Sequence, residues 1–373
     1  MTAQEIERKT ETTPKKIKLV ISNLHMGKGR FLENGGMNPL EEFYFNEKFV
    51  EYINYYSSGI YKDYEVELII NGDFINFLQV DYKGHFLSVL TESVSLELLK
   101  KVVKGHKNVF DALASFAAKE NKQITYIIGN QDQAMLWPSC KLYLNQVIGF
   151  PVRFKNIMHY FDGFHIEHGH MYDAINRVDP KKFFLKKNLP EPILNLPIGS
   201  HFFIELVLKV KMKYPFIDKV RPFKKLVTWT MFNHTKLFIS SIIATIKFIV
   251  SNFFFKNNPR KNFSLKTLSK MLIQSALFPD LSQSARRLLN NDRIHTVIFG
   301  QSQGYKYRQW EMDKEFFNVG NWTEITSLDI SSLGKVSKLT YVLIEYPTDE
   351  SRPRARLKEW RGYYRIEEDV VIS

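Results

Sequence analysis

Five short motifs carry the residue types that could bind a metal ion or a phosphate group. In chain order they are Asn23-Leu-His25, Gly72-Asp73, Gly129-Asn130-Gln131-Asp132, His168-Gly-His170 and Gly300-Gln301-Ser-Gln303. Carboxylate oxygens suit hard cations, and imidazole nitrogens suit transition metals. A single Gly-Asp pair is usually an ordinary turn, and a single histidine is more often structural than a ligand. The ordered occurrence of all five motifs is what indicates one site.

Short apolar runs precede most of these motifs and predict the elements that position them. Residues 17–21, 68–70, 124–128 and 297–299 fit buried strands, and two aromatic-rich strands are predicted around 152–160 and 164–167. Helices are predicted over 43–57 and over 88–118 with a break near Gly105, and antiparallel strands over 317–322 and 339–345. Strands alternating with helices predict an α/β fold, whose ligand chemistry collects at the carboxyl ends of the strands.

Taken together, the motifs resemble those of the calcineurin-like metallophosphoesterases, whose pattern runs Asp-x-His, Gly-Asp, Gly-Asn-His-Asp/Glu, His and Gly-His-x-His. The match spans about residues 17–322. Gly72-Asp-Phe-Ile-x-Phe77 and His168-Gly-His-x-x-Asp173 are also similar to the branch containing UDP-2,3-diacylglucosamine diphosphatase. The resemblance implies a β-sandwich flanked by helices (αββα). It also implies a two-metal site that polarises a phosphoryl group and supplies the attacking oxygen.

The resemblance also implies a role for each motif position. Asp73 would bridge both metals, and Asp132 would orient the side chain at position 131, where the family has a proton-donating histidine. The remaining ligand positions are 23, 25 and 303 for the first metal, and Asn130, His168 and position 301 for the second. The residues expected to contact substrate are His170, Lys28 and Arg30.

Four positions carry an amide where the family has an ionisable side chain. Asn23 replaces the first aspartate and Gln131 the acid histidine, while Gln301 and Gln303 replace both histidines of the last motif. An amide oxygen is a neutral, weaker ligand, and glutamine has no titratable proton to donate. The family's ligands retained here are His25, Asp73, Asn130 and His168. We therefore expect at most one weakly held divalent ion (Mn, Mg, Fe or Zn), or none.

The sequence predicts a protein of metallophosphoesterase descent that has lost most or all hydrolytic activity and still binds a phosphorylated lipid or nucleotide. The alternative is an active, divergent metal-dependent phosphoesterase acting on a phospholipid or a nucleotide-lipid pyrophosphate. Drift at tolerant loops, or amides introduced deliberately to inactivate an enzyme, would give the same substitutions. Whether the chain is an enzyme therefore stays open.

A basic insert is the second informative feature. Residues 181–262 contain 16 Lys and Arg against three acidic residues, a balance of +13 that equals the net charge of the whole chain. The polar residues Asn233, Lys236, Ser240, Lys247 and Ser251 fall on one narrow helical face, and apolar residues cover the rest. Lys236 and Lys247 leave no run of roughly 18 uncharged residues, which a membrane-spanning helix needs.

Such an insert suits the surface of an anionic membrane, and equally a helical cap whose apolar faces pack on one another. The diacylglucosamine diphosphatases, which carry a helical insert over the site and act on a lipid, favour the membrane. Nucleic acid is a third partner. It is disfavoured because surfaces that bind single strands expose stacking aromatics rather than a wide aliphatic face.

The expected organisation is a disordered tail (1–16), a first core segment (17–180), an inserted basic helical cap (181–290) and a second core segment (291–373). The single cysteine, Cys140, cannot form an internal disulfide, and the N-terminal residues are too polar for a signal peptide. We therefore expect a protein that is cytoplasmic or peripheral at the inner face of the membrane.

Overall fold

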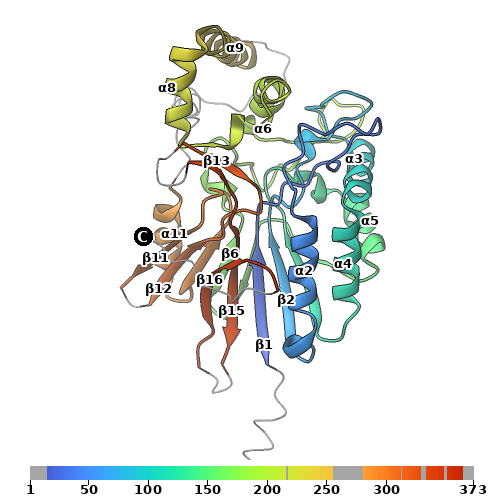
Figure 1. Cartoon of the computed structure of the whole chain (residues 1–373), viewed down its shortest axis with the longest axis vertical. Helices are drawn as coiled ribbons and strands as arrows, with labels where there is room; N and C mark the ends of the chain where they lie inside the picture. Colours follow the sequence, from blue (N-terminus) through green and yellow to red (C-terminus); the bar gives the residue numbers. More distant parts are fainter. Residues whose placement is uncertain are drawn as a thin grey trace, which may run out of the picture.

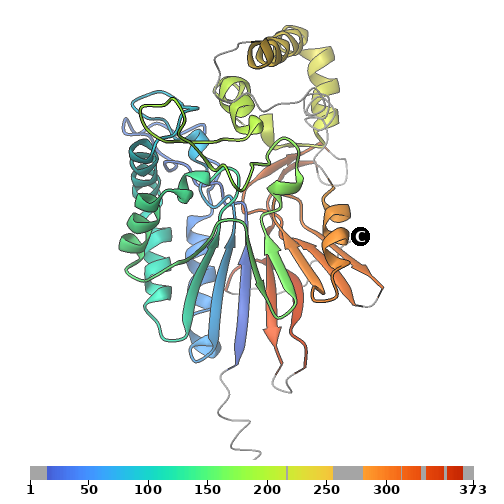
Figure 2. The same ribbon diagram turned by 180° about the vertical axis from the view of Figure 1, so that it is seen from behind.

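Two β-sheets lie face to face at the centre of the computed structural model (Figures 1 and 2). The residues described are 15–215, 217–254, 280–311, 313–328, 333–347 and 351–363. The first sheet, in spatial order, consists of β16 (Arg354–Trp360), β15 (Leu339–Tyr346), β1 (Lys16–Ile21), β2 (Glu65–Asn71), β3 (Lys122–Ile127) and β4 (Arg153–Lys155). The second consists of β11 (Lys306–Trp310), β12 (Lys314–Asn318), β10 (Thr296–Phe299), β6 (Phe164–Glu167) and β5 (Met158–Phe161).

The parallel strands β1, β2 and β3 are buried on both faces. In β1, Leu19 joins the apolar cluster shared with the helices, and Val20 joins the cluster shared with the second sheet. Leu68 and Ile69 of β2 divide in the same way. Successive side chains of a strand point to opposite faces, so a continuous apolar run is what a doubly covered strand requires.

Helices cover both outer faces of the sandwich. The first sheet is covered by α2 (Asn46–Tyr55), α3 (Glu92–Gly105), α4 (Lys107–Ala117) and α5 (Pro138–Ile148), and the second by α11 (Ser282–Leu289). The order helix, sheet, sheet, helix confirms the predicted α/β architecture with αββα layers. The predicted break near Gly105 is also confirmed, because α3 ends there and a Cβ on Gly105 would lie 2.2 Å from the Lys28 carbonyl oxygen.

Two strand predictions need correction. The segment expected to form one strand around 152–160 forms β4 in the first sheet and β5 in the second, so the chain crosses between the sheets there. The antiparallel strand expected over 317–322 is β12, which ends at Asn318 and pairs in parallel with β10 and antiparallel with β11. The second sheet is therefore mixed.

One charged cluster is buried between the two sheets. Lys18 forms an ion pair with Glu67, and the Thr125 hydroxyl donates to the same carboxylate at 2.6 Å. The His159 ring lies 3.3 Å from Glu67, and Lys18 sits over the Phe161 ring. Burial opposes ionisation of Glu67, but His159 and Lys18 outweigh it and lower its pKa to about 2.

Short elements complete the described chain. Short strands are β7 (Phe184–Leu185), β8 (Ile193–Leu194), β9 (Val220–Arg221), β13 (Ile325–Ser327) and β14 (Gly334–Val336). Short 3₁₀ turns span Gly59–Tyr61, Phe77–Gln79, Gln133–Leu136, His170–Tyr172 and Ile217–Lys219. β9 pairs with β13, which joins the insert to the C-terminal part of the chain.

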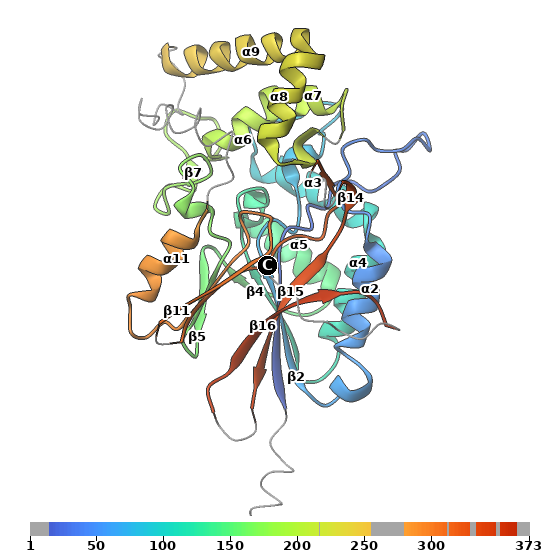
Figure 3. The same ribbon diagram turned by 60° about the vertical axis from the view of Figure 1, so that its left-hand side comes forward.

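The helical insert lies beyond the carboxyl ends of the central strands (Figures 1 and 3). It contains α6 (Ile198–Phe202), a π-helical segment (Phe203–Val207), α7 (Leu208–Lys211), α8 (Phe223–Asn233) and α9 (Thr235–Phe254). Residues 1–14, 255–279 and 364–373 lie outside the described part of the chain. The predictions for the N-terminal tail, for residues 255–279 of the cap and for the last residues of the second core segment therefore stay predictions. The predicted division into segments stays a prediction.

The helix expected across 233–251 is two helices. The chain breaks at His234, so Asn233 belongs to α8 and does not share a face with Lys236. Across the described residues, no single helix has both the length and the apolar character needed to cross a membrane. The pair α8 and α9 meets that test only when taken together, and it is bent by 118°.

Candidate functional site

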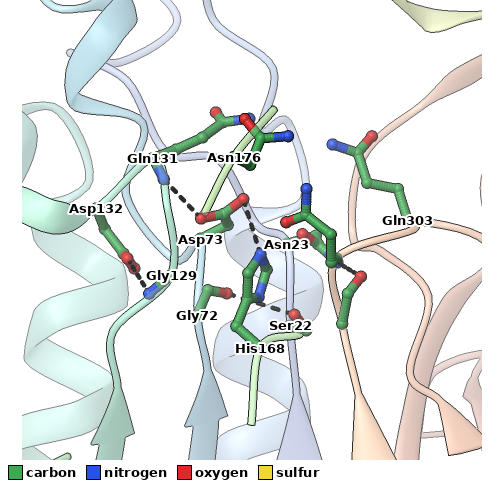
Figure 4. Close-up of polar contacts among 12 residues, drawn as sticks. Ser22, Asn23, Gly72, Asp73, Gly129, Gln131, Asp132, His168, Asn176 and Gln303 are labelled. Atoms are coloured by element: carbon green, nitrogen blue, oxygen red, sulfur yellow. Dashed lines mark hydrogen bonds and ion pairs between the residues drawn. The ribbon is translucent and has the colours of Figure 1, made fainter. Parts of the chain in front are cut away.

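The five motifs meet where β1, β2, β3, β6 and β10 end (Figure 4). The His25 amide donates to the Asp73 carbonyl at 3.0 Å, and the Gln131 amide donates to Asp73 Oδ1 at 2.9 Å. The Gln301 amide donates to the His168 carbonyl at 2.8 Å. Hydrogen bonds between neighbouring loops thus gather the residues predicted from sequence to be ligands.

The backbone at the site is held in a conformation that most side chains avoid. Asn23, His25, Asp73 and Gln303 have φ of 57°, 54°, 52° and 56°, in the left-handed region. Such backbone strain persists only where the surroundings enforce it, and it concentrates at functional sites. Gly72 has φ of 77°, and a Cβ there would lie 2.5 Å from the His168 ring. Only glycine lets His168 approach the end of β2 this closely.

His25 uses both ring nitrogens in hydrogen bonds to glutamine side chains. Its Nδ1 lies 2.9 Å from Gln131 Oε1, which can only accept, so Nδ1 carries the proton. Its Nε2 lies 3.1 Å from Gln303 Nε2, which donates. Burial, with the nearby Lys219 ammonium, lowers the pKa of His25 to about 4. The imidazole is therefore neutral near pH 7 and already has a partner on each side.

Asn23 makes two hydrogen bonds that an aspartate could not make. Its Nδ2 donates to the carbonyl oxygens of Gly300 and Gly320, both at 2.7 Å. A carboxylate has no donor and would face two carbonyl oxygens instead. The amide at position 23 is thus fitted to its surroundings, while its Oδ1 is buried without a hydrogen-bond partner among the described residues.

Asp73 and His168 form an ion pair at the second predicted metal position. His168 Nε2 lies 3.2 Å from Asp73 Oδ2, and His168 Nδ1 donates to the Asn71 carbonyl at 2.9 Å. Burial disfavours both charges, but their attraction outweighs it, raising the pKa of His168 and lowering that of Asp73. A proton on His168 therefore balances the Asp73 carboxylate.

The residues present do not fit a two-metal centre. At the first position His25 is engaged on both sides and Asn23 directs its amide group at carbonyls. At the second position the buried oxygens Asn130 Oδ1 and Gln301 Oε1 lack hydrogen-bond partners within the described chain, so a single cation is the most this donor set suits. Among the described residues, no three His, Cys, Asp or Glu side chains are arranged to hold a metal ion.

Asp132 uses both carboxylate oxygens in hydrogen bonds. Its Oδ1 accepts from the Gly129 amide at 2.6 Å, and its Oδ2 accepts from the Phe74 amide at 3.0 Å and the Tyr126 hydroxyl at 2.7 Å. Burial and the charge on Asp73 raise the pKa of Asp132 to about 7. These bonds tie two loops together, and a role for Asp132 in orienting the side chain at position 131 stays a prediction.

The three residues expected to contact substrate lie in different surroundings. His170 is buried, its ring centre is 5.6 Å from that of His168, and burial lowers its pKa to about 3. Lys28 forms an ion pair with Asp81. Arg30 lies over the Phe31 ring at 5.6 Å. A substrate contact for His170, Lys28 or Arg30 stays a prediction.

Sequence reasoning missed a cluster of buried charges beside His25. Glu42 forms ion pairs with Lys211 and Lys219 of the insert, and Lys211 also lies 2.8 Å from Asp218. The pKa of Glu42 falls well below its usual value because the two lysines outweigh the effect of burial. Nothing local pairs Glu42 with a lysine 169 positions later, so no sequence signal pointed to this cluster.

Asn176 is a second residue that sequence reasoning missed. Figure 4 shows its side chain beside Asp73 and Gln131. Its Nδ2 donates to Asp173 Oδ2 at 2.7 Å, and Asp173 accepts a longer bond of 3.3 Å from Gln301 Nε2. The Asp173 of the His-Gly-His-x-x-Asp pattern was the available signal, because it connects these two amides.

No protein-family model and no curated protein matches this chain. Among solved structures, the chain is similar to a dimetal phosphatase from Danio rerio, with 9% sequence identity and a TM-score of 0.34. The match covers 92% of this chain and 99% of that one. A likeness this low carries no argument about the site. The α/β fold rests on the sheets and helices described above.

Proposed function

We propose that this protein binds a phosphorylated lipid or nucleotide at a site of metallophosphoesterase descent that no longer hydrolyses its ligand. The observation that carries the proposal is the position of His25 between the side chains of Gln131 and Gln303. The nitrogens that would serve the first metal are occupied, so two-metal activation of an attacking oxygen is not available. Gln131 also cannot donate a proton to a leaving group.

Unpaired polar atoms support continued ligand binding. Asn23 Oδ1, Asn130 Oδ1, Gln301 Oε1 and His170 Nδ1 are buried without hydrogen-bond partners within the described residues. Each such group costs about 1–3 kcal/mol, so several together favour a bound species that satisfies them. The Lys219 ammonium near His25 and the basic insert favour an anionic ligand.

A second candidate is a divergent enzyme that uses one metal. Asp73, Asn130 and His168 remain at the second position, and two unpaired amide oxygens lie there. A cation at this position would compete with the proton on His168 for Asp73. The divalent ions that this position could bind are those of Mn, Mg, Fe and Zn. An enzyme using one of them would need a proton donor other than Gln131.

Metal analysis combined with a hydrolysis assay tests the proposal. We expect at most one divalent ion per chain in purified protein, and negligible Mn²⁺-dependent turnover of bis(p-nitrophenyl) phosphate. The revertant Asn23→Asp, Gln131→His, Gln301→His, Gln303→His, folded with Mn²⁺ present, should show measurable turnover. The Gln131→His change should contribute about 10²–10⁴-fold. Two tightly bound metals, or wild-type turnover that Asp73→Ala abolishes, would contradict loss of hydrolysis.

Ligand binding needs its own measurement. We expect the melting temperature of the unmodified protein to rise with a nucleoside diphosphate or a lysophosphatidic acid, because a ligand of the folded state stabilises it. A ligand present at 100 times its dissociation constant adds about 2.7 kcal/mol. Inorganic sulfate at equal ionic strength is the control. No shift with either class of phosphorylated compound would count against a retained binding site.

A further inference from the structure

One side of α9 is apolar and faces outward. We call this set the α9 stripe: Ile239, Ile242, Ile243, Ile246 and Val250, each 44–55% exposed. Phe248 lies on the opposite side of the helix, is 4% exposed, and packs against Phe202 and Ile198 of α6. α9 therefore has one face that the rest of the described chain covers and one that it leaves open.

α8 also carries exposed apolar side chains. Among its described side chains Leu226 and Thr230, one turn apart, are buried, whereas Trp229 and Phe232 are 50% and 73% exposed. α8 meets α9 at 118°, and the two helices lie at the end of the molecule farthest from the start of β1 (Figures 1 and 3). We call Trp229, Phe232 and the α9 stripe the docking face. A large exposed apolar patch indicates an interaction surface.

The charge around the docking face has one sign. Residues 223–254 contain four lysines and no acidic residue. At 100° per residue, Lys236 and Lys247 lie beside the α9 stripe rather than opposite it. Both are exposed, and among the described residues neither takes part in an ion pair. Lysine side chains can lie along apolar surface while their ammonium groups reach a charged layer.

We infer that α8 and α9 form a docking surface for an anionic lipid bilayer. Helices with lysines on one face and Trp, Phe and aliphatic side chains on the next lie in the plane of an interface and bury the apolar stripe at the acyl boundary. A contact between two copies is disfavoured because it would bring two sets of lysines together. This surface does not depend on what the candidate site binds.

The exposure of the α9 stripe distinguishes a membrane-binding surface from a self-packed helical cap, the two hypotheses that the sequence left open. A self-packed cap would bury the α9 stripe against its own helices, whereas the apolar cluster that joins α9 to the rest of the insert contains Phe248 and Ile249 and leaves the stripe exposed. Nucleic acid would match the lysines but leave the aliphatic stripe in water. A bilayer accounts for both the lysines and the stripe.

Vesicle co-sedimentation of the full chain tests the inference. We expect binding to vesicles of phosphatidylcholine mixed with phosphatidylglycerol, and much weaker binding to phosphatidylcholine alone. Binding should weaken with added salt, because surface potentials are screened. The fluorescence of Trp229 should shift to shorter wavelength on binding, and the Trp229→Phe variant should lose that shift while still binding.

Two pairs of substitutions locate the contact. Ile242→Asp with Ile246→Asp should reduce partitioning at least about 100-fold, because it places two carboxylates in the stripe. The matched control is Ile60→Asp with Leu142→Asp, which changes the net charge by the same amount. These two apolar side chains lie outside α8 and α9 and are 71% and 60% exposed. It should bind like the unmodified protein. Lys236→Gln with Lys247→Gln should weaken binding about 30-fold, at about fivefold per lysine.

Three outcomes would overturn the inference. They are equal binding to neutral and anionic vesicles, no binding to either, and unchanged binding by the Ile242→Asp, Ile246→Asp variant. An oligomer in lipid-free solution that this variant dissociates would assign the face to contacts between copies. Retention of anionic-vesicle binding by a protein that fails every ligand test would leave the docking surface standing and reject only the proposed ligand site.

Discussion

At the scale of single residues, the surroundings of Asn23 suit an amide rather than a carboxylate. The amide donates to two backbone carbonyls from neighbouring loops, which a carboxylate could not do. An acid at this position should therefore destabilise the metal-free protein.

We predict that Asn23→Asp lowers the free energy of unfolding by about 2–4 kcal/mol, because two carbonyls lose their donor and face a buried carboxylate. The matched control is Asn321→Asp, since Asn321 donates to a single carbonyl, that of Gln303 at 2.9 Å. It should cost less than half as much. Urea unfolding in the presence of a chelator measures both, and equal losses would contradict the special role of Asn23.

The glycine that precedes Asp73 is predicted to be irreplaceable. Gly72→Ala should destabilise by about 2–5 kcal/mol, the sum of a left-handed backbone penalty and a clash with the His168 ring. Gly84 has a similar φ of 82°, but a Cβ there would meet nothing within 4 Å. Gly84→Ala should therefore cost only about 1–2 kcal/mol. Thermal unfolding of the two variants should separate crowding from backbone strain.

The sequence identified which residues gather at the site but not how they pair. Gln131, Gln303 and His25 were predicted to be neighbours from the motif pattern, and the structure brings them together. Their hydrogen bonds depend on amide orientations that no spacing encodes. The bonds that Asp132 accepts from the Tyr126 hydroxyl and two backbone amides were not predicted either, because they join segments whose contact no local pattern encodes.

At the scale of elements, the apolar runs predicted the central strands well. Runs buried on both faces have few alternatives, so β1, β3 and β10 lie close to their predicted bounds. The break between α8 and α9 was missed because no glycine or proline marks His234 and the helical pattern continues through it. The transfer of the chain between sheets after β4 depends on long-range pairing, which local pattern does not contain.

The ion pair between the sheets makes stability depend on acid pH. The pKa of Glu67 is lowered to about 2, so its contribution is full above its ordinary pKa near 4.5 and is lost as pH falls through about 2. Glu67→Gln should be less stable near neutral pH by about 3–5 kcal/mol, because Lys18 is left unpaired. That difference should shrink as pH falls from about 5 to about 2.

Urea unfolding at several pH values measures this difference. Glu345, whose pair with Arg356 is 38–48% exposed at the surface, is the control, and Glu345→Gln should change stability by at most about 1 kcal/mol. A difference for Glu67→Gln that stays constant across the acid range would show that Glu67 is not held ionised by its neighbours.

At the scale of the whole molecule, Glu42 joins the insert to the core. Its carboxylate pairs with Lys211 and Lys219, and all three side chains are at most 6% exposed. Glu42→Gln should cost about 3–5 kcal/mol because it leaves the buried Lys219 ammonium without its counter-charge and leaves Lys211 with Asp218 alone. We also expect faster tryptic cleavage within α8 and α9, since the insert loses its attachment beside His25.

Removing all the charges of the Glu42 cluster should lower the free energy of unfolding less than removing the charge of Glu42 alone. The combined variant Glu42→Leu, Lys211→Met, Lys219→Met, Asp218→Asn should recover part of the stability lost in Glu42→Gln, because it removes the charge from all four members of the cluster and buries no unpaired charge. Glu97→Gln, which disrupts an exposed pair with Lys100, is the control for both measurements. Slower cleavage of Glu42→Gln than of the unmodified protein would contradict the attachment.

Because α8 and α9 lie beyond the carboxyl ends of β1 and β2, docking through them would fix the orientation of the molecule relative to the bilayer (Figure 1). A chain resting on the docking face would hold its candidate site between the sandwich and the bilayer. Its ligand would then be collected from a plane rather than from a volume. The rate at which ligand meets the site would depend on the number of headgroups per unit area of membrane. A soluble competitor of equal affinity would be present near the site at a lower local concentration than the headgroups.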